Sequence, residues 1–211
     1  MITEDDARGF VAGRCSTTAF QLLEHYVAAL LAENGRQNLI AKATEADIWR
    51  RHIADSAQLL DHVSCETDNW LDLGSGPGLP GLVIAIMRPS FKVILVEART
   101  RRYAWLEDQC RALGLANCEV HGARLETVAP RPADVISARA FAPLPRLLEL
   151  SGRFSTNDTL WLLPKGRSAA QELAEQLPAV RRMFHVEQSQ TDPQAGILIG
   201  RGKVRAKAGR T

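Results

Sequence analysis

Apolar side chains in the first third of the chain recur at the three- and four-residue spacing of an amphipathic helix. One such stretch follows Thr18 and Gln21, which we interpret as a capping box, and it ends at Gly35. A second stretch covers Thr44–Val63. The two helices predict an N-terminal helical cap over residues 1–66.

Beyond this cap, short apolar runs alternate with helical stretches, which predicts a mostly parallel sheet with right-handed crossovers. Helices are expected at Thr100–Leu113, which stops at Gly114, and at Ser168–Leu177. We therefore expect an α/β, Rossmann-like core with helices on both faces at residues 67–204, and a basic, disordered tail at residues 205–211. The seven expected strands cover residues 70–73, 92–96, 118–121, 134–138, 159–163, 182–186 and 197–204.

A glycine-rich turn follows the first of these strands, in the sequence WLDLGSGPGLPG. Gly74, Gly76 and Gly78 let the backbone bend and approach a ligand without a Cβ in the way. Pro80 suits the first turn of a following helix, whose free N–H groups favour a polar or anionic ligand group. The stretch predicts a nucleotide-binding loop.

The glycine spacing by itself leaves the class of nucleotide open. The dinucleotide pattern G-x-G-x-x-G fits from Gly76 through Gly78 and Gly81. Asp72, two residues before Gly74, gives D-x-G-x-G-x-G, the nucleotide-loop motif of the class I methyltransferases. A carboxylate there would repel a pyrophosphate but can face the ammonium and sulfonium groups of S-adenosyl-L-methionine. The motif favours this cofactor, and a turn without any ligand is the remaining alternative.

Polar side chains follow the other strands at the same edge of the predicted sheet, where an open α/β sheet has its ligand crevice. Glu97, after the second strand, can accept both ribose hydroxyls of an adenosine in either cofactor class. The turn Gly122–Glu126 should flank the adenine. Arg139 follows the fourth strand, where the methyl acceptor is expected, and favours a substrate that is anionic or needs no proton removed. An ion pair between Arg139 and an acid such as Glu126 is the structural alternative.

The distribution of charge is more informative than the formal net charge of +2. Arg99, Arg101 and Arg102 crowd the start of a predicted helix, where the helix dipole disfavours cations. Either a phosphate-bearing partner or a solvated face explains them. The segment after Gly200 has five basic residues and no acid. Together the two features predict RNA binding through counterion release.

A smaller polar cluster lies on the second cap helix. A solvated helix face, with His52 and Asp55 pairing locally, is the favoured interpretation. RNA contact by Arg51 and His52 is the alternative.

Length and composition exclude several other classes. The 211 residues allow one α/β domain with a helical extension. Cys15, Cys65, Cys110 and Cys118 form no C-x-x-C pair and have no histidine at metal-ligand spacing, so no metal site is expected. The acidic N-terminal stretch has no apolar signal region, and no apolar run is long enough to cross a bilayer. We expect a cytoplasmic protein, with a monomer as the default.

Several stretches resemble the RsmG (GidB) family, the small-subunit ribosomal RNA methyltransferase G. The resemblance implies a class I methyltransferase fold and methyl transfer from S-adenosyl-L-methionine, with S-adenosyl-L-homocysteine as product. The implied acceptor is N7 of one guanine in small-subunit (16S) ribosomal RNA, free or within a ribosomal particle. The matching stretches, within residues 38–166, are NLIAKAT, RRHIADS, LDLGSGPGLPGLVIAIMRP, VEARTRRYAWL, ARLE, DVISARAFAPL and LPKG.

The resemblance also implies residue roles. The family's usual lysine after the second strand is Arg101 here, which keeps the charge. Glu97 takes the ribose position. The other implied cofactor contacts are Gly74, Leu79, Leu125, Glu126 and Arg139.

Guanine N7 has a lone pair and no proton, so the implied reaction needs positioning rather than a general base. Arg139 and Lys165, at the same sheet edge, are therefore expected to hold RNA or cofactor. N7 is hard to reach in A-form RNA, so the target guanine should be unpaired or splayed. Two alternatives remain, namely a methyltransferase of the same fold for a small molecule or protein, and a non-enzymatic dinucleotide-binding regulator.

Overall fold

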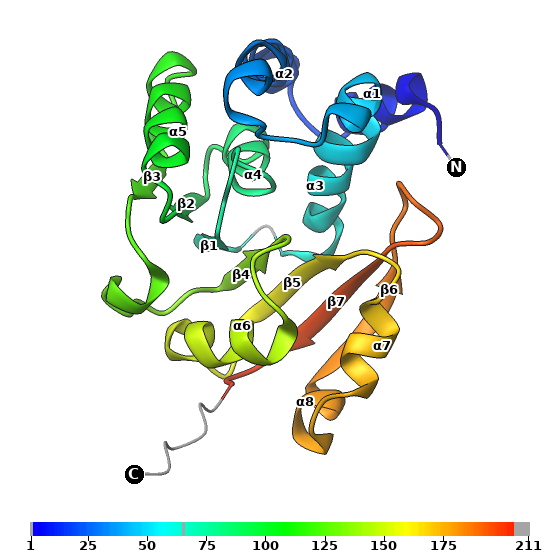
Figure 1. Ribbon diagram of the computed structural model, residues 1–211, viewed down its shortest axis with the longest axis vertical. Coiled ribbons are helices and arrows are strands. Elements are labelled where there is room, and N and C mark those ends of the chain that lie inside the picture. The colour runs from blue at the N-terminus through cyan, green and yellow to red at the C-terminus, as the bar shows by residue number, and fades with distance from the viewer. Residues whose placement is uncertain (1, 65, 205–211) are drawn as a thin grey trace.

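A seven-stranded sheet in the order β3-β2-β1-β4-β5-β7-β6 forms the centre of the protein (Figure 1). The structure is a computed structural model that describes residues 2–64 and 66–204, so the predicted tail at 205–211 lies outside the described residues. The strands are β1 (Asn69–Leu73), β2 (Lys92–Val96), β3 (Cys118–His121), β4 (Val135–Ala138), β5 (Leu160–Lys165), β6 (Phe184–Gln188) and β7 (Gly196–Arg201). The expected α/β fold with seven strands is confirmed.

Strands β1 to β5 run parallel, and β7 is antiparallel to both of its neighbours. Along β1, Trp70 packs in one hydrophobic cluster while Leu71 and Leu73 pack in the cluster on the opposite face. This alternation follows from the two-residue period of a strand. The sheet is therefore covered on both faces, as a parallel sheet requires.

Helices α1 to α5 lie on one side of the sheet and α6 to α8 on the other (Figure 1). The cap helices share a hydrophobic cluster with α4 and one sheet face. The bounds are α1 (Glu4–Ala12), α2 (Thr17–Gln37), α3 (Asp55–Ala57), α4 (Gly81–Met87), α5 (Thr100–Ala112), α6 (Leu144–Ser151), α7 (Ala169–Ala174) and α8 (Pro178–Met183).

The ends of α2 differ from those predicted. Ser16, whose hydroxyl accepts the Ala19 N–H at 3.2 Å, caps its start, so the predicted capping box at Thr18 and Gln21 is wrong. The helix runs past Gly35 and ends at Asn38, which has φ of 51°. Asparagine tolerates this left-handed conformation better than most residues.

The second cap segment is not the single regular helix that its periodicity predicts. It is a succession of 3₁₀ helix η1 (Lys42–Asp47), π-helix η2 (Trp49–Ala54), α3 and 3₁₀ helix η3 (Gln58–His62). The carboxylate of Glu4 accepts the backbone N–H groups of Trp49 at 2.7 Å and Arg50 at 3.0 Å. A carboxylate from α1 thus fixes the start of the π-helix, a local form that often occurs at functional sites.

The C-terminal region also departs from expectation. Strand β5 continues through Pro164 to Lys165, because Pro164 pairs with Ile197 of the antiparallel β7. Helix α8 was not predicted, and Arg201 ends β7 instead of belonging to a basic tail. Within the described part of the chain, no helix is both long and apolar enough to cross a bilayer.

Candidate cofactor and substrate site

The strand order reverses beside β1, with β2 and β3 on one side and β4, β5, β7 and β6 on the other. In an open α/β sheet, such a reversal leaves a crevice at the carboxyl ends of the strands. The glycine-rich turn follows β1 at this point, and Glu97 and Arg139 follow β2 and β4. The three predicted site segments therefore meet at one edge.

The three glycines of the turn have different structural roles. Gly74 and Gly78 have φ of 64° and 110°, and a Cβ on either would lie 2.4 Å from the side chain of Phe141 or Leu82. Gly76 has φ of 57°, but its Cβ would meet nothing nearer than 3.7 Å. Gly74 and Gly78 are therefore required by packing within the protein, whereas the backbone at Gly76 is open to a ligand.

Asp72 lies behind the turn. Its side chain is fully buried, accepting the Ser137 hydroxyl at 2.6 Å and the Gly81 N–H at 3.2 Å. Burial raises the pKa of Asp72 to about 6, against the opposing effect of these hydrogen bonds. This carboxylate fastens β1 to β4 and to the start of α4, and its contact with the cofactor stays a prediction. The same contact takes the Gly81 N–H, which had been expected to be free for a ligand.

Two aromatic side chains far away in the sequence also hold the turn. The carbonyl of Pro77 accepts the Tyr26 hydroxyl at 3.1 Å and the Trp105 indole N–H at 2.9 Å. Tyr26 belongs to α2 and Trp105 to α5. The cap thus supports the nucleotide loop directly, a role that helical periodicity cannot distinguish from that of an ordinary core residue.

Glu97 lies under the open part of the turn. Its Oε2 accepts the Gly76 N–H at 2.9 Å and its Oε1 accepts the Arg99 N–H at 2.8 Å. Each carboxylate oxygen can accept a further hydrogen bond, so the residue can still bind two hydroxyl groups. This buried carboxylate beside an open glycine suits the ribose of an adenosine.

Three other predicted cofactor contacts are Leu79, Leu125 and Glu126. The side chains of Leu79 and Leu125 are buried, so only their backbones are placed to meet a ligand. Glu126 is exposed and pairs with Arg146 at 3.2 Å. The structural alternative, an ion pair between Arg139 and an acid, is confirmed, but the acid is Asp55 and not Glu126.

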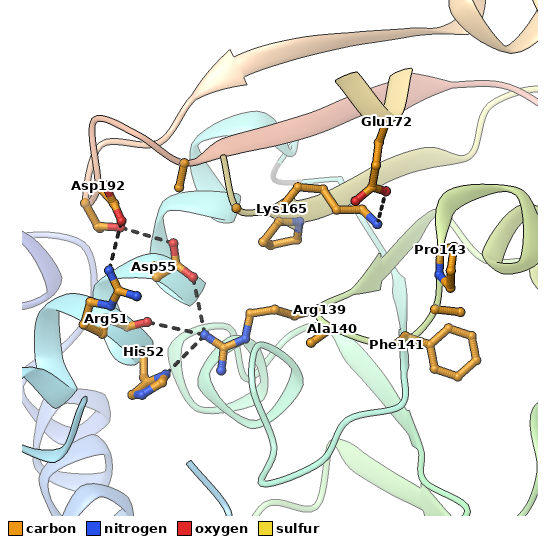
Figure 2. A pocket seen from close by; sticks show the side chains of 15 residues that line it. Arg51, His52, Asp55, Arg139, Ala140, Phe141, Pro143, Lys165, Glu172 and Asp192 are labelled. Carbon is orange, nitrogen blue, oxygen red and sulfur yellow. Dashed lines mark hydrogen bonds and ion pairs between the residues drawn. The ribbon is translucent and has the colours of Figure 1, made fainter. Parts of the chain in front are cut away.

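A cavity of about 760 Å³ opens at the carboxyl ends of β4 and β5 (Figure 2). Its wall after β4 includes Ala140, a non-glycine residue with φ of 52°, followed by Phe141. A left-handed alanine is uncommon and is often found at functional sites. Because the Phe141 ring packs over Gly74, the cavity adjoins the nucleotide loop.

Arg139 reaches across the cavity to the cap (Figure 2). Its Nη1 lies 3.4 Å from Asp55 Oδ2, 3.4 Å from the Arg51 carbonyl and 3.3 Å from His52 Nδ1. The predicted solvated face on the second cap helix is therefore wrong for His52 and Asp55. These residues form the counterpart of Arg139 instead of a local pair.

His52 is held neutral. Nδ1 accepts from Arg139, so Nε2 carries the proton and donates to the Thr44 hydroxyl at 2.8 Å. Burial, followed by the charges of Arg139 and Arg51, lowers the pKa of His52 to about 3. The ring is an uncharged part of the cavity wall.

Asp55 is held from two sides. Its Oδ1 accepts from Gln58 at 2.8 Å and from the Thr191 hydroxyl at 3.1 Å. Burial raises its pKa, and the neighbouring Arg139 acts in the opposite direction. Gln58 and Thr191 were not singled out from the sequence, because isolated polar residues in a helix and a turn have no distinguishing pattern.

The other cations of the cavity are also paired. Lys165 Nζ lies 2.8 Å from Glu172 Oε2, and Arg51 Nη1 lies 2.9 Å from Asp192 Oδ2. The arginines at the start of α5 differ from them. Among residues 2–64 and 66–204, none of Arg99, Arg101 and Arg102 forms an ion pair, and the first two are exposed.

The reversed strand order, the antiparallel β7 and the glycine-rich turn beside Glu97 define a class I methyltransferase fold. Residues 19–193 match the family described as GidB, rRNA small subunit methyltransferase G. The chain belongs to this family.

Two similar proteins are both called ribosomal RNA small subunit methyltransferase G. The protein of Erythrobacter litoralis (strain HTCC2594) is 58% identical, over 96% of this chain and 98% of its own length. The protein of Sphingopyxis alaskensis is 54% identical, over 97% of this chain and 88% of its own length.

Solved structures extend the fold comparison. A SAM-dependent methyltransferase from Aquifex aeolicus has a TM-score of 0.56 and 13% identity, over 78% of this chain and 96% of its own. A ribosomal protein L11 methylase from Lactobacillus delbrueckii subsp. bulgaricus has a TM-score of 0.56 and 14% identity, over 72% of this chain and 79% of its own. At these identities the similarity shows the fold alone.

Proposed function

We propose that this protein transfers a methyl group from S-adenosyl-L-methionine to N7 of a specific guanine in small-subunit ribosomal RNA. The observation that carries the proposal is the pairing within the cavity beside the nucleotide loop. Every titratable side chain described there forms an ion pair, except His52, which is a neutral ring. Such a site suits an acceptor atom that has no proton to lose.

The residues of the crevice fit the cofactor. The open backbone at Gly76 and the buried Glu97 carboxylate would hold the nucleoside, with Leu79 and Leu125 contributing backbone contacts. When bound, S-adenosyl-L-methionine supplies the methyl group and leaves as S-adenosyl-L-homocysteine.

Guanine N7 has a lone pair and no proton, so no residue has to act as a general base. The contribution of the protein is to orient and desolvate the base beside the nucleotide loop. Arg139 is placed for this task because it lines the cavity and is fixed by three contacts to the cap.

The cavity volume of about 760 Å³ is sufficient for one base and its ribose. N7 of a paired guanine lies in the deep major groove of A-form RNA, so the target should be unpaired or splayed. We expect the substrate to be a folded loop of the ribosomal RNA, free or within the small subunit.

We further expect a cytoplasmic monomer, with the helical cap and the core divided near residue 66.

Incubation of the protein with labelled S-adenosyl-L-methionine and unmodified small-subunit RNA tests the proposal. We expect label on N7 of one guanine, identified by mapping the modified nucleotide. Label only in added proteins or small molecules would instead support a methyltransferase of the same fold with another substrate. Label at a different atom of the RNA would contradict the N7 assignment.

The arginines at the start of α5 are expected to bind RNA phosphates. Replacing Arg101 by alanine should weaken RNA binding and lower the slope of log Kd against log salt by about one unit, as losing one phosphate contact would. Titrations with small-subunit RNA at several salt concentrations measure this slope. Arg111→Ala, on the same helix but paired with Asp108 at 3.0 Å, is the matched control. An unchanged slope in Arg101→Ala would place this arginine on a solvated face.

A further inference from the structure

A lysine and a glutamate stand side by side on the cavity wall. Lys165 ends β5, Glu172 lies in α7, and their charged atoms are 2.8 Å apart. Both side chains line the cavity, and their exposed fractions are 11% and 29% (Figure 2). The wall therefore presents a hydrogen-bond donor and an acceptor next to each other.

Glu172 retains capacity to accept further hydrogen bonds. Its Oε1 accepts from the Ser168 hydroxyl at 3.2 Å, and its Oε2 faces Lys165. Within the described residues, Oε2 is buried and accepts no hydrogen bond, so acceptor capacity remains on both oxygens, since each has two lone pairs. Asp55 is more fully occupied, because its carboxylate already faces Gln58, Thr191 and Arg139.

Glu172 lies in a different part of the cavity from Asp192, which is the remaining carboxylate among the lining residues. Figure 2 shows Asp192 beside Arg51 at one end, whereas Glu172 lies toward the other end, where Pro143 and Phe141 also lie. The Phe141 ring packs over Gly74 of the nucleotide loop. Glu172 is therefore toward the end of the cavity that adjoins the nucleotide loop, where a reacting base is expected.

This arrangement is complementary to one edge of guanine. Guanine presents the O6 acceptor next to the N1–H and N2–H₂ donors, so an ammonium matches O6 and an adjacent carboxylate matches the two donors. Adenine has the reverse arrangement, with the N6–H₂ donor next to the N1 acceptor. An adenine in the same position would place its N6–H₂ donor against the Lys165 ammonium and its N1 lone pair against the Glu172 carboxylate.

Resting on the function proposed above, we propose that Glu172 is a specificity-determining residue that accepts the N1–H and N2–H₂ groups of the target guanine. Lys165 donates to O6 of the same base. Because N7 is on the other side of O6 from these contacts, it stays free to take the methyl group. The pairing selects guanine without taking any part in proton transfer.

Inosine tests this assignment because it differs from guanosine only by lacking the N2 amino group. Small-subunit RNA is assembled with either guanosine or inosine at the mapped target, and kcat/KM for methyl transfer is measured on each. The wild-type protein should prefer guanosine by roughly tenfold, as expected for one hydrogen bond to a carboxylate. In Glu172→Gln, which keeps the size of the side chain but leaves only one neutral acceptor oxygen, this preference should fall to about two- to threefold.

Glu175→Gln, also in the helical segment after β5 but outside the cavity, is the matched control and should keep the preference. The Kd of Glu172→Gln for S-adenosyl-L-methionine should equal that of the wild type. Its thermal unfolding midpoint should fall, because the largely buried Lys165 loses its carboxylate partner, but the preference compares two substrates on the same folded protein. A merely structural role for Glu172 would lower both rates equally and leave the ratio unchanged, which would overturn the assignment. If the wild-type protein does not methylate the guanosine RNA at all, the proposed function itself fails.

Discussion

Replacing Glu97 by alanine is expected to raise the Kd for S-adenosyl-L-methionine by at least about 100-fold. The loss of two hydrogen bonds from ribose hydroxyls to a buried carboxylate, at about 1.5 kcal/mol each, accounts for this factor. The variant also removes the acceptor of the Gly76 and Arg99 N–H groups. The nucleotide loop would thus lose a ligand contact and part of its own support.

Isothermal titration of the purified variant with S-adenosyl-L-methionine measures this effect. Glu119→Ala is a suitable control, since Glu119 is an exposed acid on β3 whose partners are His121 and Arg131. The control should bind like the wild type. A Glu97→Ala protein that binds within threefold of the wild type would show that Glu97 does not hold the ribose.

Replacing Arg139 by alanine is expected to abolish methyl transfer and to lower the free energy of unfolding at neutral pH by about 3 kcal/mol. The stability effect arises because the Asp55 carboxylate would be left buried without its cation. The activity effect arises because Arg139 lines the substrate cavity and is held there by the cap. Denaturant unfolding and the RNA methylation assay measure the two effects separately.

The stability loss should depend on pH in a defined direction. Burial already raises the pKa of Asp55 above its ordinary value of 3.8, and Arg139 opposes the rise, so removing Arg139 raises it further. A raised carboxyl pKa gives stability that is present below the ordinary value and is lost as pH rises through the folded-state value. The difference between variant and wild type should therefore be small near pH 4 and greatest at neutral pH.

A double variant separates the two roles of Arg139. Arg139→Ala combined with Asp55→Asn has no unpaired carboxylate at this position, so it should regain most of the lost stability and lose the added pH dependence. Methyl transfer should stay absent. Recovery of activity together with stability would mean that Arg139 acts only by balancing the charge of Asp55.

Much of the fold was predictable because it depends on local patterns. The short, nearly continuous apolar runs of β1 and β2 specify strands with two buried faces, and Gly114 ends α5 close to where expected. Segments whose geometry depends on distant partners were predicted less well. The cap segment around Trp49 is a π-helix whose first N–H groups bind Glu4, 45 residues earlier in the chain.

The sequence by itself determined the nucleotide loop, because the left-handed backbone at Gly74, Gly76 and Gly78 is accessible to glycine and to few other residues. It also determined which residues follow the parallel strands, and hence that Glu97 and Arg139 share one edge. Only the tertiary structure decided that Arg139 pairs with Asp55, 84 residues away, and that Asp72 is fastened to Ser137 behind the loop. The reason is physical: strand period and glycine conformation are properties of neighbouring residues, whereas the partner of a buried charge depends on which distant segments the packed core brings together.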